Sequence, residues 1–592
     1  MKHLFLHLFL FFTLAGFAQN EQLAMNYFEK GDFEKALIAY EELLKNQPGN
    51  NLYFQKVVES NQQLSKFDQA KELIQTRMDK YKQGNMMVEM GYNYQLQKDG
   101  ANAKKFYDKA LEKIQENPSN VYAIAVNFEK KALLDYALKS YQLATTLEPK
   151  NNFNYQMAVI YGQQGKTDMM IEKFLEEAQR NPQSSIMIQN QLSRFMTEDA
   201  ETTFNDSLRK ALLIRTQKDQ DIFWNQFLSW FFVQQKEYGK AFLQEKAIYK
   251  REPETFSNIV NLAQLAIEEG DDESATEIIN FVLENTQDVD LQIFAHSFLM
   301  ENKIEKALEK DYPAINTEFE LLMKKFGVSP YSLSLQSLQA HFVTFNMKNP
   351  ELGKSILKKA LELPINKYQE ADIKMELADI LLFEEKFNQA LIYYSQIEED
   401  LKNDEVGHEA SLKSAKTSYF KSDFVYATSQ FKVLKSASTQ LIANDALEYF
   451  LLINDNTVAD STQVALKKFA RADYLLYQNK TQEALTQFQA ILKDHKGEEI
   501  ESVTLLRLGQ TYEKMHDYNS ALSQYQNIID NHKDGIYIDE ALYFSAEIYN
   551  NDLKTPEKAK PLYEAILFNH QDSIFFIEAR KKFRQLRGDA NL

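Results

Sequence analysis

The chain has 592 residues, with 67 Lys plus Arg against 85 Asp plus Glu, so its formal net charge is −18. This charge disfavours nucleic acid and anionic lipid as partners, and the absence of cysteine excludes disulfides and thiolate chemistry. Only 11 Pro and 17 Gly stand beside 41 Phe and 31 Tyr, which predicts an all-α chain with ample material for burial.

The first 18 residues have the pattern of a signal peptide. A basic start at Lys2 precedes an apolar run over residues 4–14, and Gly16 and Ala18 are the small residues that cleavage before Gln19 requires. The run is short for a bilayer, which disfavours the alternative of an uncleaved anchor, and no later segment is apolar for long enough to span one. We expect an exported protein, periplasmic in the first instance, with secretion or outer-membrane association as alternatives.

Residues 19–182 repeat with a period close to 34, which predicts five units in tandem. A small or slender residue early in each second helix marks the period, and a large residue follows it four positions later. The marked pairs are Ala36/Tyr40, Ala70/Ile74, Ala103/Tyr107, Ala137/Tyr141 and Met170/Phe174. This spacing predicts antiparallel helix pairs that bury one face each and are stable only when stacked.

The period weakens over residues 183–333, which we expect to be divergent helical repeats. Pro313, Gly327 and Pro330 cluster where the period fails, so the segment 289–333 is the expected hinge. A second array follows over residues 334–573, with an irregular helix pair expected at 439–458. Residues 574–592 read as an amphipathic capping helix and tail, with Ile574, Ile577, Phe583 and Leu586 on its apolar side.

The clearest unit spans residues 502–531. Its first helix carries Leu505, Leu508, Gly509 and Tyr512 on one face, and its second helix carries Ala521, Tyr525 and Ile528. This pattern resembles the tetratricopeptide repeat, and the resemblance covers about two thirds of the mature chain. It implies a right-handed superhelical solenoid of helix–turn–helix units whose first helices line a concave face. The late units are also similar to repeats of bacterial envelope assembly proteins.

The resemblance also implies where a partner would bind. Ligands of the family usually contact fixed first-helix positions, which in this sequence are Gln55, Glu59, Gln62, Val88, Tyr92, Gln95, Tyr122, Val126, Glu129, Tyr155, Val159 and Gly162. Tyrosines beside amide side chains suit an extended peptide, although the same tyrosines could instead pack between neighbouring helices. The family's carboxylate clamp, Lys or Arg at position 5 with Asn at position 9, is absent from these units, which argues against recognition of a free peptide C-terminus.

Residues 223–232 hold the two tryptophans, Trp224 and Trp230, in a helix too aromatic to bury one face only. We favour a core wedge between divergent units, because aromatic helices are usually interior. If either tryptophan is exposed, it is the best candidate for a binding hot spot.

We find no sequence motif for catalysis, for a phosphate-binding loop or for a metal site. His495, His532 and His570 each fall at the end of a second helix, where they are expected to cap carbonyl groups. The sequence therefore predicts a non-enzymatic protein without cofactor, a scaffold or adaptor for other envelope or secreted proteins. The alternative is a protein that binds envelope polysaccharide by stacking sugar rings on the tyrosine-rich groove. The oligomeric state cannot be inferred.

Overall fold

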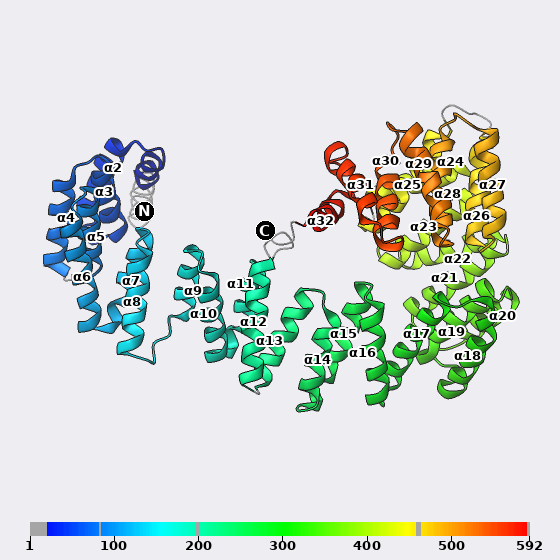
Figure 1. The fold of residues 1–592 in the computed structure, drawn as a ribbon, viewed down its shortest axis with the longest axis horizontal. Helices are drawn as coiled ribbons and strands as arrows, with labels where there is room; N and C mark the ends of the chain where they lie inside the picture. Colours follow the sequence, from blue (N-terminus) through cyan, green and yellow to red (C-terminus); the bar gives the residue numbers. More distant parts are fainter. Residues whose placement is uncertain are drawn as a thin grey trace, which may run out of the picture. The chain divides into compact units, whose positions relative to one another are not determined.

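The computed structural model describes residues 20–81, 84–196, 202–219, 221–437, 439–457 and 463–588. Within these ranges the chain is built of helices joined by short turns and contains no β-strand (Figure 1). The predicted all-α repeat architecture is confirmed, and the predicted signal peptide lies outside the described residues. Two compact units are present, Met1–Phe223 (unit 1) and Trp224–Leu592 (unit 2).

In unit 1 a helical segment over residues 20–29 precedes the numbered helices. These are α2 (Phe33–Asn46), α3 (Asn51–Gln63), α4 (Phe67–Tyr81), α5 (Asn85–Leu96), α6 (Gly100–Glu116), α7 (Val121–Lys130), α8 (Leu134–Leu147), α9 (Asn154–Gln163), α10 (Thr167–Arg180), α11 (Ser185–Ser193) and α12 (Thr202–Lys218). Along α2 to α10 each helix packs against a sequence neighbour, as the predicted tandem pairs require.

Unit 2 continues the stacking of helix pairs. Its helices are α13 (Ile222–Gln234), α14 (Tyr238–Tyr249), α15 (Phe256–Glu268), α16 (Asp272–Asn285), α17 (Val289–Glu305), α18 (Tyr312–Phe326), α19 (Leu333–His341), α20 (Pro350–Ala360), α21 (Lys367–Phe383), α22 (Phe387–Asp400), α23 (Glu405–Phe420), α24 (Phe424–Ala437), α25 (Gln440–Asp455), α26 (Val464–Tyr477), α27 (Thr481–Asp494), α28 (Ile500–Lys514), α29 (Tyr518–Asn531), α30 (Ile538–Glu547), α31 (Pro556–Asn569) and α32 (Phe576–Arg587).

The short turns inside the helix pairs share one construction. A residue with left-handed backbone ends the first helix, and the next residue caps the second helix. Between α5 and α6, Lys98 has φ 61° and the Asp99 carboxylate accepts a hydrogen bond from the Asn102 backbone N–H. Between α28 and α29, His516 has φ 59° and Asp517 caps in the same way. This turn reverses the chain within a few residues, so the two helices run antiparallel.

The small and large residues of the repeat meet across each helix pair. A Cβ atom on Gly509 would lie 2.2 Å from the Tyr525 ring, so only glycine allows that close approach. The buried tyrosine then donates a hydrogen bond to a polar residue four positions beyond the small residue: Tyr525 to Glu513 at 2.9 Å and Tyr141 to Glu129 at 2.7 Å. The hydrogen bond offsets the free-energy cost of burying the tyrosine hydroxyl, so the hydroxyls of Tyr525 and Tyr141 both have a partner.

Of three expectations about unit 2, the first and the last meet a different structure. The irregular pair expected at 439–458 is a single helix, α25. Residues 289–333 fold as α17, α18 and short 3₁₀ turns that share one hydrophobic cluster with α19, so the hinge stays a prediction about motion. The cap α32 buries Ala579 and Phe583, whereas Ile574 and Ile577 are 84% and 62% exposed because they point away from the last pair.

Candidate functional site

The predicted groove of unit 1 begins on α3, where the positions are already partly engaged. Gln55 and Glu59 are half-buried, and Gln62 is buried with its amide 3.5 Å from the Asn93 side chain. The Glu59 carboxylate pairs with Lys56 at 3.0 Å within its own helix. These side chains therefore contact other residues of the protein and also lie on the first-helix face.

On α5 the prediction needs correction at one position. Val88 is fully buried, so it belongs to the core and cannot contact a partner. Tyr92 is half-buried, and the exposed Gln95 accepts a hydrogen bond from the Tyr107 hydroxyl at 2.8 Å. The residue after α7, Lys131, reaches over the Tyr92 ring with its ammonium 4.9 Å from the ring centre.

Lys131 joins first helices of three repeats and was not singled out from the sequence. Its ammonium lies 3.3 Å from the Glu89 carboxylate and 3.7 Å from that of Glu59. The side chains of Lys131 and Glu89 are only 8% and 4% exposed. We call Glu59, Glu89, Tyr92 and Lys131 the Lys131 cluster, which holds α3, α5 and the end of α7 together.

The open part of the groove lies on α7 and α9. Tyr122 is 58% exposed and Val126, one turn further on, is 41% exposed. The Tyr122 ring contacts Phe153 edge-on at 5.3 Å between centroids, which fixes its orientation. Tyr155 and Val159 are half-buried, as is Gly162, and Tyr155 packs on Phe174. Tyr122 is therefore open to a partner, whereas Tyr155 packs between neighbouring helices.

The aromatic helix α13 resolves the two interpretations given for its tryptophans. Trp224 is fully buried and packs near Phe227, so it is part of the core and the hot-spot alternative is wrong for it. Trp230 is half-buried and meets Phe227 edge-on at 5.4 Å. The core wedge is the structural role of this helix.

The histidines at the ends of second helices occupy C-cap positions, as expected. His495, His532 and His570 follow α27, α29 and α31, and each donates its backbone N–H to a carbonyl of the last turn. The described residues contain no group of three or more His, Asp or Glu arranged to hold a metal ion. In the same part of the chain, no helix is both long and apolar enough to cross a bilayer.

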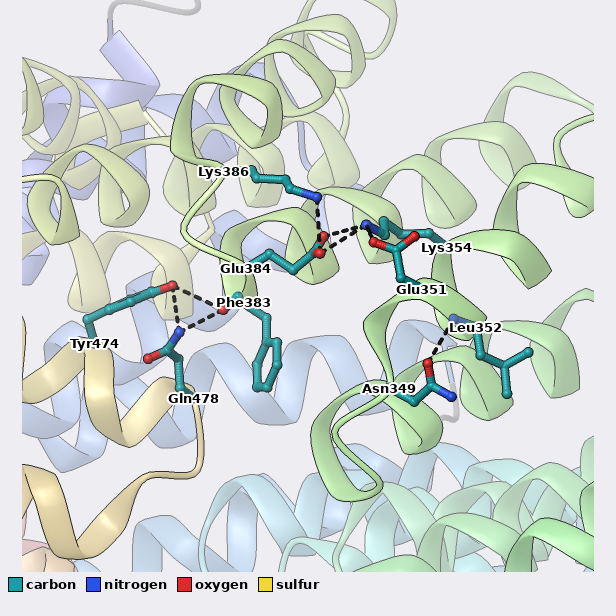
Figure 2. A network of polar contacts seen from close by, with 9 residues as sticks. All are labelled: Asn349, Glu351, Leu352, Lys354, Phe383, Glu384, Lys386, Tyr474 and Gln478. Carbon is teal, nitrogen blue, oxygen red and sulfur yellow. Dashed lines mark hydrogen bonds and ion pairs between the residues drawn. The ribbon is translucent and has the colours of Figure 1, made fainter.

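Unit 2 contains contacts between segments far apart in sequence, which the repeat pattern did not predict. The Tyr474 hydroxyl on α26 donates to the carbonyls of Leu382 and Phe383 at the end of α21, at 2.5 and 3.2 Å. The Gln478 amide donates to the Phe383 carbonyl at 2.7 Å (Figure 2). These side chains add donors to carbonyls at the end of α21, where the Leu382 carbonyl also accepts the Glu385 backbone N–H at 2.9 Å.

The end of α21 is also held from its other side. Lys354 of α20 lies 2.7 Å from Glu351 and 2.7 Å from Glu384, and Lys386 lies 3.0 Å from Glu384, as Figure 2 shows. The Lys354 and Glu384 side chains are 9% and 14% exposed. Helix α26 packs on α23 as well as on α27, and its end meets α21 through Tyr474 and Gln478.

Unit 2 also has a half-open pocket of about 360 Å³, which we call the inner chamber. It is lined by residues of α21, α22, α23, α25, α26 and α28: Asp379, Leu382, Tyr394, Lys413, Lys416, Phe420, Tyr449, Asp473, Leu476, Tyr477 and Arg507. Charged and aromatic side chains thus face one space from six helices. In the sequence these residues span 129 positions and follow no common spacing, so pattern analysis had no signal for them.

Charges in the inner chamber are arranged as two buried pairs. Asp379 accepts hydrogen bonds from Lys413 at 2.6 Å and from the Tyr394 hydroxyl at 2.5 Å. Asp473 lies 3.2 Å from Arg507 and accepts from the Tyr419 hydroxyl at 3.1 Å. Burial raises the pKa of Asp473 against the opposing effect of Arg507.

Comparison with known proteins places these helix pairs in a family. Residues 22–50 and 504–535 match the family model described as tetratricopeptide repeat. No curated protein matches the chain. The first match lies in unit 1 around α2, and the second covers α28 and α29, the clearest repeat in the sequence.

Several solved structures are similar to this chain at low identity. One is described as Naa15/Naa10 bound to HypK-THB (12% identity, TM-score 0.28, covering 97% of each chain). Another is the APC/C hetero-tetramer Cut9–Hcn1 (13%, 0.24, covering 90% of this chain and 96% of that one). A third is yeast Tom70 (14%, 0.29, covering 85% and 99%). A match in each unit and tandem helix pairs along the described residues thus show that the chain contains tetratricopeptide repeats at residues 22–50 and 504–535.

Proposed function

We propose that this protein is a non-enzymatic scaffold of the bacterial cell envelope that binds segments of other proteins along the first-helix face of its repeats. The observation that carries the proposal is the pair Tyr122 and Val126 on α7. Both are apolar, exposed and one helical turn apart, so together they form a stripe on an otherwise well-packed helix. The signal-peptide pattern of residues 1–18 supports export, and thus an envelope location, as part of the same proposal.

The Tyr122 ring is suited to anchor a partner because it is already ordered. Its edge contact with Phe153, which is itself buried, holds the ring before any ligand arrives. An ordered aromatic side chain loses little conformational entropy on binding, and such residues often contribute most of the energy of an interface. Gln55 of α3 and Tyr155 of α9 are half-buried on the same predicted face and would supply polar contacts.

The test is affinity capture from envelope extract with the wild-type protein and a Tyr122→Ser, Val126→Ser variant. Leu147→Ser with Ile186→Ser is the matched control, because these residues are exposed apolar side chains of unit 1 outside the predicted groove. We expect one or two stoichiometric proteins that the groove variant loses and the control retains, with binding reproduced by the purified partner. Retention of the same proteins by the groove variant would refute the proposal.

The polysaccharide alternative is decided by the same variants. If extract yields no specific protein and a glycan array gives a signal that the Tyr122→Ser, Val126→Ser variant loses, the groove binds sugar rings instead. Silence across the array excludes that alternative. A protein ligand and a polysaccharide ligand would thus use the same surface, but the first would be detected by affinity capture and the second by the glycan array.

A further inference from the structure

The last described helix, α32, has one side that packs on the preceding helices and one that faces outward (Figure 1). Ala579 and Phe583 are its buried residues, and they belong to the hydrophobic cluster of α30 and α31. On the opposite side, Ile577, Lys581 and Arg584 are spaced by four and then three residues, which places them along one face of the helix. All three of these side chains are exposed.

Ile574 lies in the turn before the helix, and we call Ile574, Ile577, Lys581 and Arg584 the α32 stripe. Its two isoleucines are 84% and 62% exposed, and Phe568, at the end of α31, is 70% exposed. Large apolar side chains that are this accessible protrude from the surface rather than line a groove. Exposed apolar residues of this kind mark sites that enter the apolar part of a partner or of a bilayer.

The charge around the α32 stripe is positive, although the chain as a whole is acidic. Helix α32 carries five cations and one acid: Arg580, Lys581, Lys582, Arg584 and Arg587 against Glu578. The turn before it and contacts from α30 and α31 add one cation and three acids: Lys560, Asp539, Glu547 and Asp572. Six cations thus stand against four acids, in a chain whose net charge is −18.

The positions of these charges favour the cations at the surface. The two acids of α30 are recessed, since Asp539 is half-buried and the Glu547 side chain is 21% exposed. Glu578 is exposed, but it is rotated by roughly 100° from Ile577 around the helix axis and so lies on the flank. The stripe itself contains two cations and no acid. Acids elsewhere in the chain act weakly on it, because salt screens charges over about 8 Å.

We propose that the α32 stripe binds the surface of an anionic lipid bilayer. Ile574 and Ile577 enter the boundary between headgroups and acyl chains, while Lys581 and Arg584 contact lipid phosphates. Charge complementarity selects the lipid, because two cations without an acid favour phosphatidylglycerol over a zwitterionic lipid. The protruding isoleucines favour a bilayer over an acidic protein segment, because a bilayer accepts them without a matching pocket. This site is separate from the Tyr122 groove.

The test is sedimentation of the purified protein with lipid vesicles. The protein starts at Gln19, so that the apolar run of residues 4–14 does not contribute to binding. The vesicles contain either phosphatidylcholine alone or equal parts of phosphatidylcholine and phosphatidylglycerol. We expect at least about tenfold tighter binding to the anionic vesicles, and weaker binding when the salt concentration is raised.

One double variant tests the apolar half of the stripe. Ile574→Ser with Ile577→Ser should weaken binding to the anionic vesicles about tenfold or more, because no side chain then enters the acyl boundary. Val425→Ser with Val433→Ser is the matched control, because these two side chains of α24 are 83% and 61% exposed. The control should bind like the wild type.

A second double variant tests the charged half. Lys581→Gln with Arg584→Gln should also weaken binding to the anionic vesicles about tenfold or more. The control is Lys104→Gln with Lys240→Gln, two lysines of α6 and α14 that are 69% and 54% exposed. Both variants change the net charge of the chain by the same amount, so a loss confined to the first identifies a local contact.

A fluorescent label reports insertion directly. The chain has no cysteine, so Ile574→Cys supplies a single thiol for the environment-sensitive fluorophore NBD. On anionic vesicles the emission should become stronger and move to shorter wavelength, because the label leaves water. The same label attached to a Val425→Cys variant should show no change.

Several results would overturn the proposal: no binding to the anionic vesicles, equal affinity for both kinds of vesicle, losses no greater than those of the controls, or an NBD label that stays in water. If the isoleucine variant instead loses an acidic protein from envelope extract while the vesicles bind nothing, the stripe is a protein-binding site and the bilayer inference is wrong. The outcome is independent of the proposed scaffold function, because the Tyr122→Ser, Val126→Ser variant should bind the anionic vesicles like the wild type.

Discussion

Replacing Lys131 with methionine removes the cation that two carboxylates of unit 1 share. The methionine keeps most of the side-chain volume, so packing over the Tyr92 ring changes little. The Glu89 carboxylate, only 4% exposed, then has no positive partner at 3.3 Å. Glu59 is affected less, because it keeps Lys56 at 3.0 Å. The perturbation therefore isolates one buried charge.

The expected cost follows from the loss of one partner of a buried ion pair, which typically costs about 3–5 kcal/mol. The Lys131→Met variant should therefore lose roughly 3 kcal/mol at pH 7.

Hydrogen–deuterium exchange measures this loss where it occurs. Peptides from α3, α5 and α7 should exchange about a hundredfold faster in the variant at pH 7 than in the wild type. Lys113→Met is the control, because its pair with Glu116 is solvent-exposed and worth about 0.5 kcal/mol. A loss equal to that of the control would refute the reasoning.

Three further substitutions probe unit 2. Tyr474→Phe should cost only about 0.5–1.5 kcal/mol, because the Leu382 carbonyl keeps the Glu385 N–H at 2.9 Å and the Phe383 carbonyl keeps the Gln478 amide at 2.7 Å; a loss of about 3 kcal/mol or more would contradict this. Burial and a hydrogen bond that the protonated Glu540 carboxyl donates to the Asp539 carboxylate raise the pKa of Glu540 to about 8, above the 4.5 of an ordinary glutamate. The contribution of Glu540 to stability is therefore complete below pH 4.5 and is lost as pH rises through 8. Glu540→Gln should flatten the pH dependence of hydrogen exchange in α30. An exchange profile equal to that of the wild type would contradict this role of Glu540. Gly407→Ala brings a Cβ within 2.1 Å of the Leu401 carbonyl oxygen and should lower the melting temperature, whereas the control Gly100→Ala, with open space around it, should not.

Much of the fold was predictable because packing between neighbouring helices determines the pattern of apolar residues along the sequence. The period of 34, the small–large pairs such as Gly509 and Tyr525, and the short turns all describe packing between helices adjacent along the chain. That packing decides which residues are apolar at each helical turn, so it can be inferred without a structure. The first-helix contact positions implied by the resemblance include Tyr122, which is exposed, but also Val88, which is buried.

The sequence by itself determined the helix pairs, their order and the family of the repeat. Which side chains of different repeats meet depends on the tertiary structure: Lys131 with Glu89, Tyr474 with the end of α21, and the eleven residues of the inner chamber. The physical reason is that each repeat adds a small rotation to the last, and the sum over several repeats sets these contacts. Polar pairs formed in this way need no regular spacing, and one unpaired helix, α25, changes them without altering the pattern within any repeat.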